Sequence, residues 1–223
     1  MKVGVVIQAR MGSTRLPGKV LMDLHGRPVL AHVLDRSRAI RGVDTVIIAT
    51  TVEAQDDPIA EMCKRWRVPC YRGNETDVLD RYYRAAALHQ LTVVARITSD
   101  CPLLDPAVVQ LVLEEFVHSG PDYCSNVHPC TYPDGLDVEV MSIEALERAW
   151  CEAADPFERE HVTPYIWRRP IGPEHLDGFR LRNVPGKTDH SALRWTVDTS
   201  EDLDNVRALM HRQGTSTDYR KLL

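Results

Sequence analysis

The sequence predicts an α/β fold with a mostly parallel, doubly wound sheet, and two observations lead to that prediction. First, four short runs rich in Val and Ile do not alternate with polar residues, as expected of strands buried on both faces: residues 3–9, 45–50, 68–71 and 93–98. Second, apolar residues between these runs recur every three or four positions, the period of an amphipathic helix. The resulting β-α-β-α order calls for parallel strands joined by right-handed crossovers.

Each predicted helix has a recognisable start or period. Two of them follow an Asp-Pro pair, where the proline takes a first-turn position whose N–H has no helical partner. The predicted helices in this part of the chain are 29–40, 57–66, 78–86 and 106–118.

The regular alternation stops between about residues 122 and 192, where prolines recur and only three segments look regular. These are the stretch "DVEVMS" and two helical stretches, 142–153 and 156–168. We interpret 122–192 as an arm inserted into a single domain, 1–223, and expect it to form the dimer interface and part of the substrate pocket.

After the arm, the stretch "LRWTVD" at 193–198 predicts the last strand of the core sheet. A final helix is expected from Thr199 to Gln213. Its start, Thr199-Ser200-Glu201-Asp202, fits a capping box in which Asp replaces Glu, and Gly214 is a suitable stop.

Composition excludes several function classes. The net charge of −5 and the pI near 6.0 argue against a general nucleic-acid binder. No apolar run approaches the roughly 18 residues of a membrane span, and the chain begins without a signal-peptide pattern, so we expect a cytoplasmic protein without a membrane partner. Six cysteines lack C-x-x-C spacing and are expected to be free thiols.

The loop after the first strand, "QARMGSTRLPGK" at 8–19, concentrates groups that bind phosphate. Ligands of α/β sheets bind beyond the carboxyl ends of the strands, where this loop lies. Gly12 and Gly18 allow close backbone approach, and the loop's hydroxyls and cations can bind phosphate oxygens. The pattern is neither G-x-G-x-x-G nor a P-loop, which disfavours a dinucleotide fold or a P-loop ATPase. The alternative is a solvated basic loop.

Two acidic residues also end predicted strands. Asp100 follows the strand in "RITSDCPLLDP", and Asp198 ends "RWTVD". Hard carboxylate oxygens that face a phosphate loop suit a bound Mg²⁺. Taken alone, Asp198 also fits a helix N-terminal acid and Asp100 an Asx-turn before proline.

Six segments resemble the cytidylyltransferase family, in particular its SpsF-like branch of spore coat polysaccharide biosynthesis. They are "IQARMGSTRLPGKVL", "YRGNETDVLDRYY", "RITSDCPLLDP", "YPDGLDVEVMS", "EREHVTPYI" and "RWTVDTSEDL", and the resemblance as a whole covers residues 3 to about 210. A more distant similarity is to the CMP-acylneuraminate and CMP-3-deoxy-manno-octulosonate synthetases. The resemblance implies a GT-A-like nucleotidyltransferase fold and Mg²⁺-dependent transfer of CMP from CTP to an acidic sugar, with release of pyrophosphate.

The resemblance also implies roles for individual residues. Lys19, Arg10 and Asp100 are expected to be catalytic, and Asp100 and Asp198 to hold magnesium. The expected nucleotide-binding residues are Gln8, Ala9, Arg10, Gly12, Ser13, Arg15, Lys19, Arg72 and Asp77. In the arm, Arg159 and His161 are candidates for binding the acceptor, although a solvated helix face explains them as well.

Two departures from the sugar-acid synthetases place the chain nearer the SpsF-like branch. Position 8 is Gln where those enzymes usually have Pro, and position 99 is Ser where Gly is frequent. Three other function classes remain open at this point: a sugar-1-phosphate nucleotidyltransferase, a GT-A glycosyltransferase and a non-catalytic nucleotide-binding module. The metal-binding D-x-D of glycosyltransferases is replaced here by S-D-C at 99–101.

Overall fold

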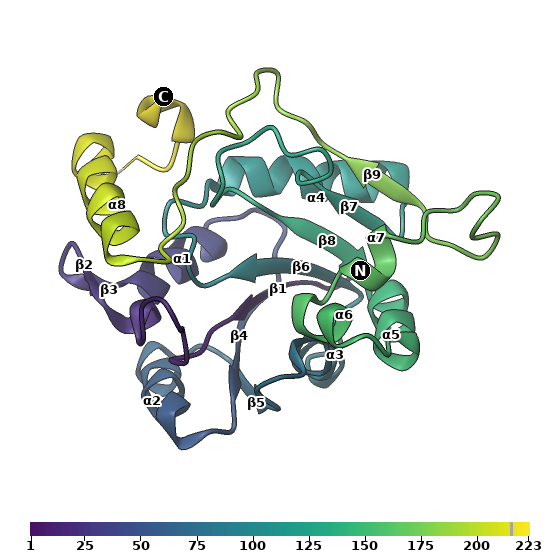
Figure 1. Ribbon diagram of the computed structural model, residues 1–223, viewed down its shortest axis with the longest axis horizontal. Helices are drawn as coiled ribbons and strands as arrows, with labels where there is room; N and C mark the ends of the chain where they lie inside the picture. The colour runs from purple at the N-terminus through teal and green to yellow at the C-terminus, as the bar shows by residue number, and fades with distance from the viewer. Residues whose placement is uncertain (215) are drawn as a thin grey trace.

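The computed structural model describes residues 1–214 and 216–223 and has a seven-stranded sheet at its centre (Figure 1). The strands are β1 Val3–Gln8, β4 Thr45–Thr51, β5 Cys70–Gly73, β6 Val93–Thr98, β7 Tyr123–Ser125, β8 Glu139–Ser142 and β9 Leu181–Asn183. Their order is β5-β4-β1-β6-β8-β7-β9, and only β8 is antiparallel to its neighbours. A two-stranded ribbon, β2 Asp23–Leu24 with β3 Arg27–Pro28, lies outside this sheet. The mostly parallel α/β sheet predicted from the sequence is confirmed.

Helices cover both faces of the sheet, as the doubly wound prediction requires. The α-helices are α1 Val29–Arg38, α2 Asp57–Trp66, α3 Val78–Leu88, α4 Pro106–Ser119, α5 Ile143–Glu152, α6 Pro156–His161, α7 Pro164–Trp167 and α8 Ser200–Gln213. Short 3₁₀ helices occur at Lys19–Leu21, Ala54–Asp56 and Tyr219–Leu222.

Alternate residues of β1 divide the core into two layers. Val5 and Ile7 pack with apolar side chains of α1, α2 and α4, whereas Val6 packs on the opposite face with α3, α5 and α7. A third, smaller core joins α8 to the loop containing Tyr132 and Leu136. The side chains of β1 are therefore buried on both faces, which explains its unbroken apolar run.

The predicted last strand at 193–198 is wrong. Only Arg194 forms a bridge, to Asp134, and the rest of the segment is not strand. Its backbone N–H groups donate to loop carbonyls and not to a neighbouring strand: Trp195 N–H donates to the Asp134 carbonyl at 2.7 Å, and Val197 N–H donates to the Asp100 carbonyl at 2.8 Å. The place beside β6 is occupied by β8, so this segment lies over loops at the end of the sheet.

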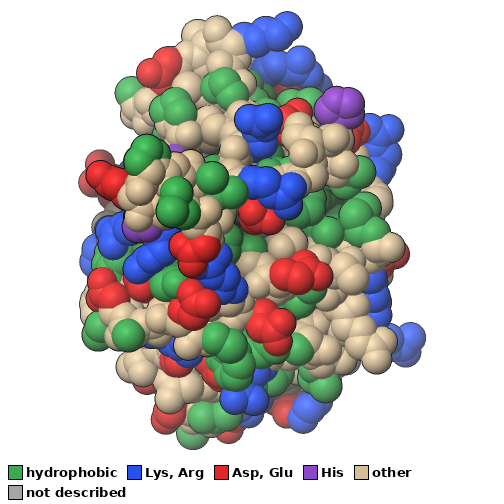
Figure 2. Space-filling view, turned by 90° about the vertical axis from the view of Figure 1, so that its right-hand side faces the viewer, with side chains coloured by type: hydrophobic (Ala, Val, Ile, Leu, Met, Phe, Trp, Pro, Cys, Tyr) green, Lys and Arg blue, Asp and Glu red, His purple; other side chains and the backbone are tan. Residues whose placement is uncertain are grey.

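The region 122–192 does not leave the sheet entirely, because β7, β8 and β9 all belong to it. The single helix predicted at 156–168 is two helices, α6 and α7. They separate at Val162, whose φ of 73° is incompatible with a continuing α-helix. On the face over α5 and α7, basic and acidic side chains are interspersed with hydrophobic ones (Figure 2).

Helix α8 begins as predicted. Thr199 and Asp202 exchange side-chain-to-backbone hydrogen bonds in a capping box, and Gly214, with a φ of 62°, follows the last turn. This cap fixes the backbone next to Asp198, whose own N–H donates to the Asp202 carboxylate at 3.0 Å. The helix start therefore positions a predicted site residue.

Candidate active site

A cavity of about 240 Å³ lies beyond the carboxyl ends of β1 and β6. It is lined by Gln8, Ala9, Arg10, Gly12, Ser13, Thr14, Arg15, Lys19, Val20, Val78, Arg81, Thr98, Ser99, Asp100, Glu160, His161 and Asp198. The structure thus brings together the predicted phosphate loop, both predicted metal ligands and His161 from α6. These segments are far apart in the sequence and meet at the sheet end where ligands of α/β folds bind.

Hydrogen bonds from backbone N–H groups hold the loop after β1 in place. Met11 N–H donates to the carboxylate of buried Asp56 at 2.6 Å, and Gly18 N–H donates to the Met11 carbonyl at 2.9 Å. Gly18 has a φ of 74°, a conformation that favours glycine, and it begins the 3₁₀ helix that carries Lys19. The Ser13 hydroxyl oxygen accepts from Leu16 N–H at 3.3 Å, so its hydrogen remains available to a ligand.

Lys19 lies between the two predicted metal ligands. Its Nζ is 2.8 Å from Asp100 Oδ2 and 2.8 Å from Asp198 Oδ1, and the lysine is buried. Burial by itself would lower the pKa of Lys19, but the charges and hydrogen bonds of Asp100 and Asp198 raise it above its ordinary value. Lys19 is therefore an ammonium ion neutralised by two carboxylates.

Asp198 is surrounded by three cations. In addition to Lys19, Arg15 lies 3.0 Å from Oδ1, and Arg194 contacts Oδ2. Burial would raise the pKa of Asp198, yet Lys19, Arg15 and Arg194 together lower it, so the residue is a carboxylate near neutral pH. Arg194 also contacts Asp134 at 2.5 Å and Asp202 at 3.5 Å, which anchors it outside the cavity.

The chemistry of Asp100 and Asp198 fits a divalent cation under one condition. Their carboxylates converge on a single point, now marked by Lys19 Nζ, and supply hard oxygen donors. Among the described residues, no group of three or more His, Cys, Asp or Glu is arranged to hold a metal ion. A cation bound here would thus need water and phosphate oxygens to complete its coordination, as Mg²⁺ commonly does.

Three predicted ligand residues are engaged elsewhere. Arg72 donates to the carbonyls of Thr51 at 2.8 Å and Glu53 at 3.0 Å and pairs with a carboxylate of α2. Arg159 pairs with Asp77 at 2.5 Å, and neither lines the cavity. The ligand roles of Arg72, Asp77 and Arg159 stay predictions that the geometry does not favour.

Several residues of this site could not be predicted from the sequence. Arg81 is 1% exposed, lines the cavity and donates to the carbonyls of Asn74 at 2.5 Å and Glu75 at 2.7 Å. A single arginine within the predicted helix 78–86 gave no signal of a site. Arg194 was hidden in the stretch predicted as a strand.

Asp137, from the quoted motif "YPDGLDVEVMS", does not line the cavity but lies close enough to Asp100 for their charges to interact. Its Oδ1 is buried without a hydrogen-bond partner in the described residues. Burial first, and then the charges of Asp134 and Glu139, raise its pKa to about 7. A half-buried carboxyl group near Asp100 that titrates close to neutrality is a further polar feature of this end of the sheet.

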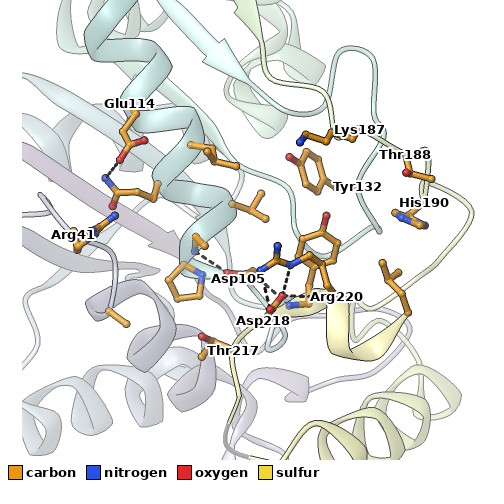
Figure 3. Close-up of a pocket in the computed structure, with 18 residues that line it drawn as sticks. Arg41, Asp105, Glu114, Tyr132, Lys187, Thr188, His190, Thr217, Asp218 and Arg220 are labelled. Carbon is orange, nitrogen blue, oxygen red and sulfur yellow. Dashed lines mark hydrogen bonds and ion pairs between the residues drawn. The ribbon is translucent and has the colours of Figure 1, made fainter.

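A larger cavity, about 830 Å³, lies between the start of α4, the loop 187–190 and the C-terminal 3₁₀ helix (Figure 3). Several of its polar groups satisfy one another: Asp105 accepts from the N–H groups of Ala107 and Tyr219, and Asp218 pairs with Arg220. It lies away from the strand ends and lacks the convergence of phosphate loop and carboxylates. We therefore take the smaller cavity as the candidate active site.

Comparison with known proteins finds relatives along nearly the whole chain. A cytidylyltransferase family model matches residues 4–221. The spore coat polysaccharide biosynthesis protein SpsF of Bacillus subtilis is 31% identical over 96% of this chain and 88% of its own length. A 3-deoxy-manno-octulosonate cytidylyltransferase of Anaeromyxobacter sp. is 37% identical over 94% of this chain and 97% of its own. The structure of a cytidylyltransferase from Leptospira borgpetersenii superposes with a TM-score of 0.91 at 32% identity, covering 100% of this chain and 92% of that one.

Proposed function

The chain belongs to the cytidylyltransferase family, and from this premise we propose that it transfers CMP from CTP to an acidic sugar and releases pyrophosphate. The premise makes it a nucleotidyltransferase enzyme with the GT-A-like fold. The acidic acceptor is suggested by the relative that acts on 3-deoxy-manno-octulosonate. The similarity to SpsF suggests a role in making a polysaccharide precursor.

One observation supports the proposal above the others. Lys19, in the phosphate loop, directly contacts the two carboxylates that end distant segments, Asp100 and Asp198, at 2.8 Å each. The groups proposed to bind phosphate and metal therefore meet at one point of one cavity. Transfer of a nucleotidyl group needs this combination, because the reaction depends mainly on positioning and charge neutralisation.

In the proposed reaction, an oxygen of the acceptor attacks the α-phosphorus while the bond to the pyrophosphate oxygen breaks in line. Lys19 and Arg10 neutralise the leaving pyrophosphate, and Arg15 binds the β- and γ-phosphate oxygens. Ser13 donates its hydroxyl hydrogen to a phosphate oxygen. These groups contact the nucleotide before and while pyrophosphate leaves. Removing one of them is therefore expected to slow the reaction more than it destabilises the fold.

Asp100 and Asp198 would hold the Mg²⁺ ion. When bound there, such an ion would supply Lewis-acid polarisation of the α-phosphate. The two carboxylates position that charge at the strand ends, and Arg194 keeps Asp198 oriented by its contacts on the outer side.

The acceptor is proposed to bind beside His161, which lines the cavity together with its arm neighbour Glu160. We also propose that the enzyme works in the cytoplasm as a homodimer, with the arm at the interface. The loop between α7 and β9 supplies exposed apolar side chains for such a contact, since Ile171 is 55% and Leu176 86% exposed.

The test is pyrophosphate release with CTP, UTP, GTP or ATP and Mg²⁺, in the presence of a panel of acidic sugars. The panel includes nonulosonic acids and 3-deoxy-manno-octulosonate. The proposal predicts release with CTP and at least one acidic sugar, and loss of that release in Asp100→Ala. Release with another nucleotide but not CTP, or release that Asp100→Ala leaves intact, would contradict it.

A further inference from the structure

The arrangement around Lys19 contains a conflict between two roles. In the proposed reaction its ammonium group binds phosphate, and Asp100 and Asp198 bind the divalent cation. In the structure the same ammonium group binds both carboxylates, with Nζ 2.8 Å from an oxygen of each. This inference rests on the proposed function and concerns the order in which its ligands can bind.

Lys19 and a divalent cation cannot occupy this point together. Mg²⁺ binds carboxylate oxygens at about 2.0–2.1 Å, so an ion shared by Asp100 and Asp198 would lie almost where Nζ now lies. Two cations so close would repel strongly in a half-buried setting. The Lys19 side chain is only 10% exposed, so water screens this repulsion poorly.

Lys19 also has the freedom to move between the two sets of partners. Its four-carbon side chain ends in a compact charge and can redirect that charge without moving the backbone. The same cavity wall carries Arg10, Ser13 and Arg15, where the triphosphate is proposed to bind. A triphosphate there offers Lys19 a new anionic partner within the cavity it already lines.

We propose that Lys19 blocks the cation site of the ligand-free enzyme, and that the nucleotide's phosphates open the site by drawing Lys19 away. The divalent cation then binds with the nucleotide or after it, and not before it. Arg15 makes the same exchange from Asp198 to phosphate, whereas Arg194, held by Asp134 and Asp202, keeps its contact with Asp198. By linkage, nucleotide and cation favour each other's binding.

The test uses Mn²⁺ alone, without nucleotide, and measures free Mn²⁺ by electron paramagnetic resonance. Wild-type enzyme is compared with Lys19→Met and with a matched control, Lys64→Met, which removes the same charge from an exposed position on α2. Lys19→Met is expected to bind Mn²⁺ about ten- to a hundredfold more tightly than the wild type, the range of ordinary coupling energies. Lys64→Met is expected to match the wild type.

A second measurement protects the test against poor folding of Lys19→Met. Mn²⁺ should raise the Tm of Lys19→Met but not that of the wild type, and the rise should disappear in Lys19→Met/Asp100→Asn. Lys19→Arg keeps a cation between the carboxylates and should bind Mn²⁺ as weakly as the wild type. Equal Mn²⁺ affinity of Lys19→Met and wild type would overturn the proposal. Because no nucleotide or acceptor is present, this outcome differs from a failure of the turnover assay.

Discussion

Lys19 and Arg159 are two predicted ligand-binding cations that the structure treats differently. Both are paired with carboxylates, Lys19 with Asp100 and Asp198 and Arg159 with Asp77. The partners of Lys19 line a cavity with it. Asp77 instead caps α3 by accepting from Asp80 N–H, while Arg159 also donates to the Trp150 carbonyl at 2.6 Å.

If Lys19 belongs to the active site as proposed, this difference separates a functional ion pair from a structural one. Arg159 ties α6 to the start of α3 and to the end of α5, so its partners belong to the framework. Breaking its contacts would destabilise the fold, and no ligand would replace them. The contacts of Lys19 can be replaced by those of a ligand that brings its own charges. An ion pair that faces a cavity is therefore a candidate for exchanging a protein partner for a ligand. An ion pair between helices, such as Arg159 with Asp77, stabilises the fold, and we call it a structural brace.

The largest effect is expected for Asp100→Asn, which removes one carboxylate of the Lys19 site. The rate of pyrophosphate release with CTP should fall by about 10²–10³, as for other losses of transition-state charge stabilisation. The free energy of unfolding should fall by less than the roughly 3–5 kcal/mol expected when a buried pair is broken completely, because Lys19 keeps Asp198 as a partner. Asp35→Asn, which removes a surface carboxylate paired with Arg27, should leave the rate unchanged. A normal rate in Asp100→Asn would mean that the Lys19 ion pairs are structural, as those of Arg159 are.

The next largest effect is on stability and concerns the structural brace formed by Arg159 and Asp77. Arg159→Met leaves Asp77 half-buried without its partner and should lower the free energy of unfolding by about 1–3 kcal/mol, measured with urea. Arg180→Met, which breaks an exposed pair with Asp122, is the control and should lower the free energy of unfolding much less. Equal losses in the two variants would mean that Arg159 contributes no more than a surface pair.

Asp137 provides a test that depends on pH. Its pKa is raised from 3.8 to about 7 in the folded protein, so between these values the folded state holds a proton that the unfolded chain releases. This group therefore makes the wild type less stable as pH rises through that window, by up to about 2–4 kcal/mol. Asp137→Asn cannot ionise, so its stability relative to the wild type should rise from pH 4 to pH 7 and then level off. A difference independent of pH would show that Asp137 is not perturbed.

The smallest effect concerns the support of Asp198. Thr199→Ala removes the cap of α8 and should lower the free energy of unfolding by about 1 kcal/mol. Because Arg194 and Lys19 still hold Asp198, the KM for CTP should change less than threefold. A large rise in that KM would mean that the helix cap, more than the ion pairs, positions the carboxylate.

The core strands and the phosphate loop could be predicted because their signals are local. The unbroken apolar run of β1 and the cations that follow it are visible within twenty residues, and position relative to a strand end is general to α/β folds. The capping box of α8 was readable for the same reason: all of its donors and acceptors lie within four residues.

The sequence is less informative where long-range contacts decide the structure. The stretch 193–198 has strand-like residues, but the place beside β6 is taken by β8, a strand from the arm. Arg159 is of a residue type that often binds ligands, yet in the structure it pairs with Asp77, which lies 82 positions away. Arg81 is a single arginine within the predicted helix 78–86 and still reaches the cavity wall. None of these outcomes is encoded in spacing along the chain.

The most direct test of the central claim is the equilibrium binding of CTP, measured by calorimetry, to the wild type, Lys19→Met and Arg159→Met. If the Lys19 cavity is the nucleotide site and Arg159 is a brace, Lys19→Met should bind CTP at least about tenfold more weakly. Folded Arg159→Met should bind it with the wild-type affinity. Undiminished CTP binding by Lys19→Met, with weakened binding by Arg159→Met, would contradict the account and move the nucleotide site to the arm.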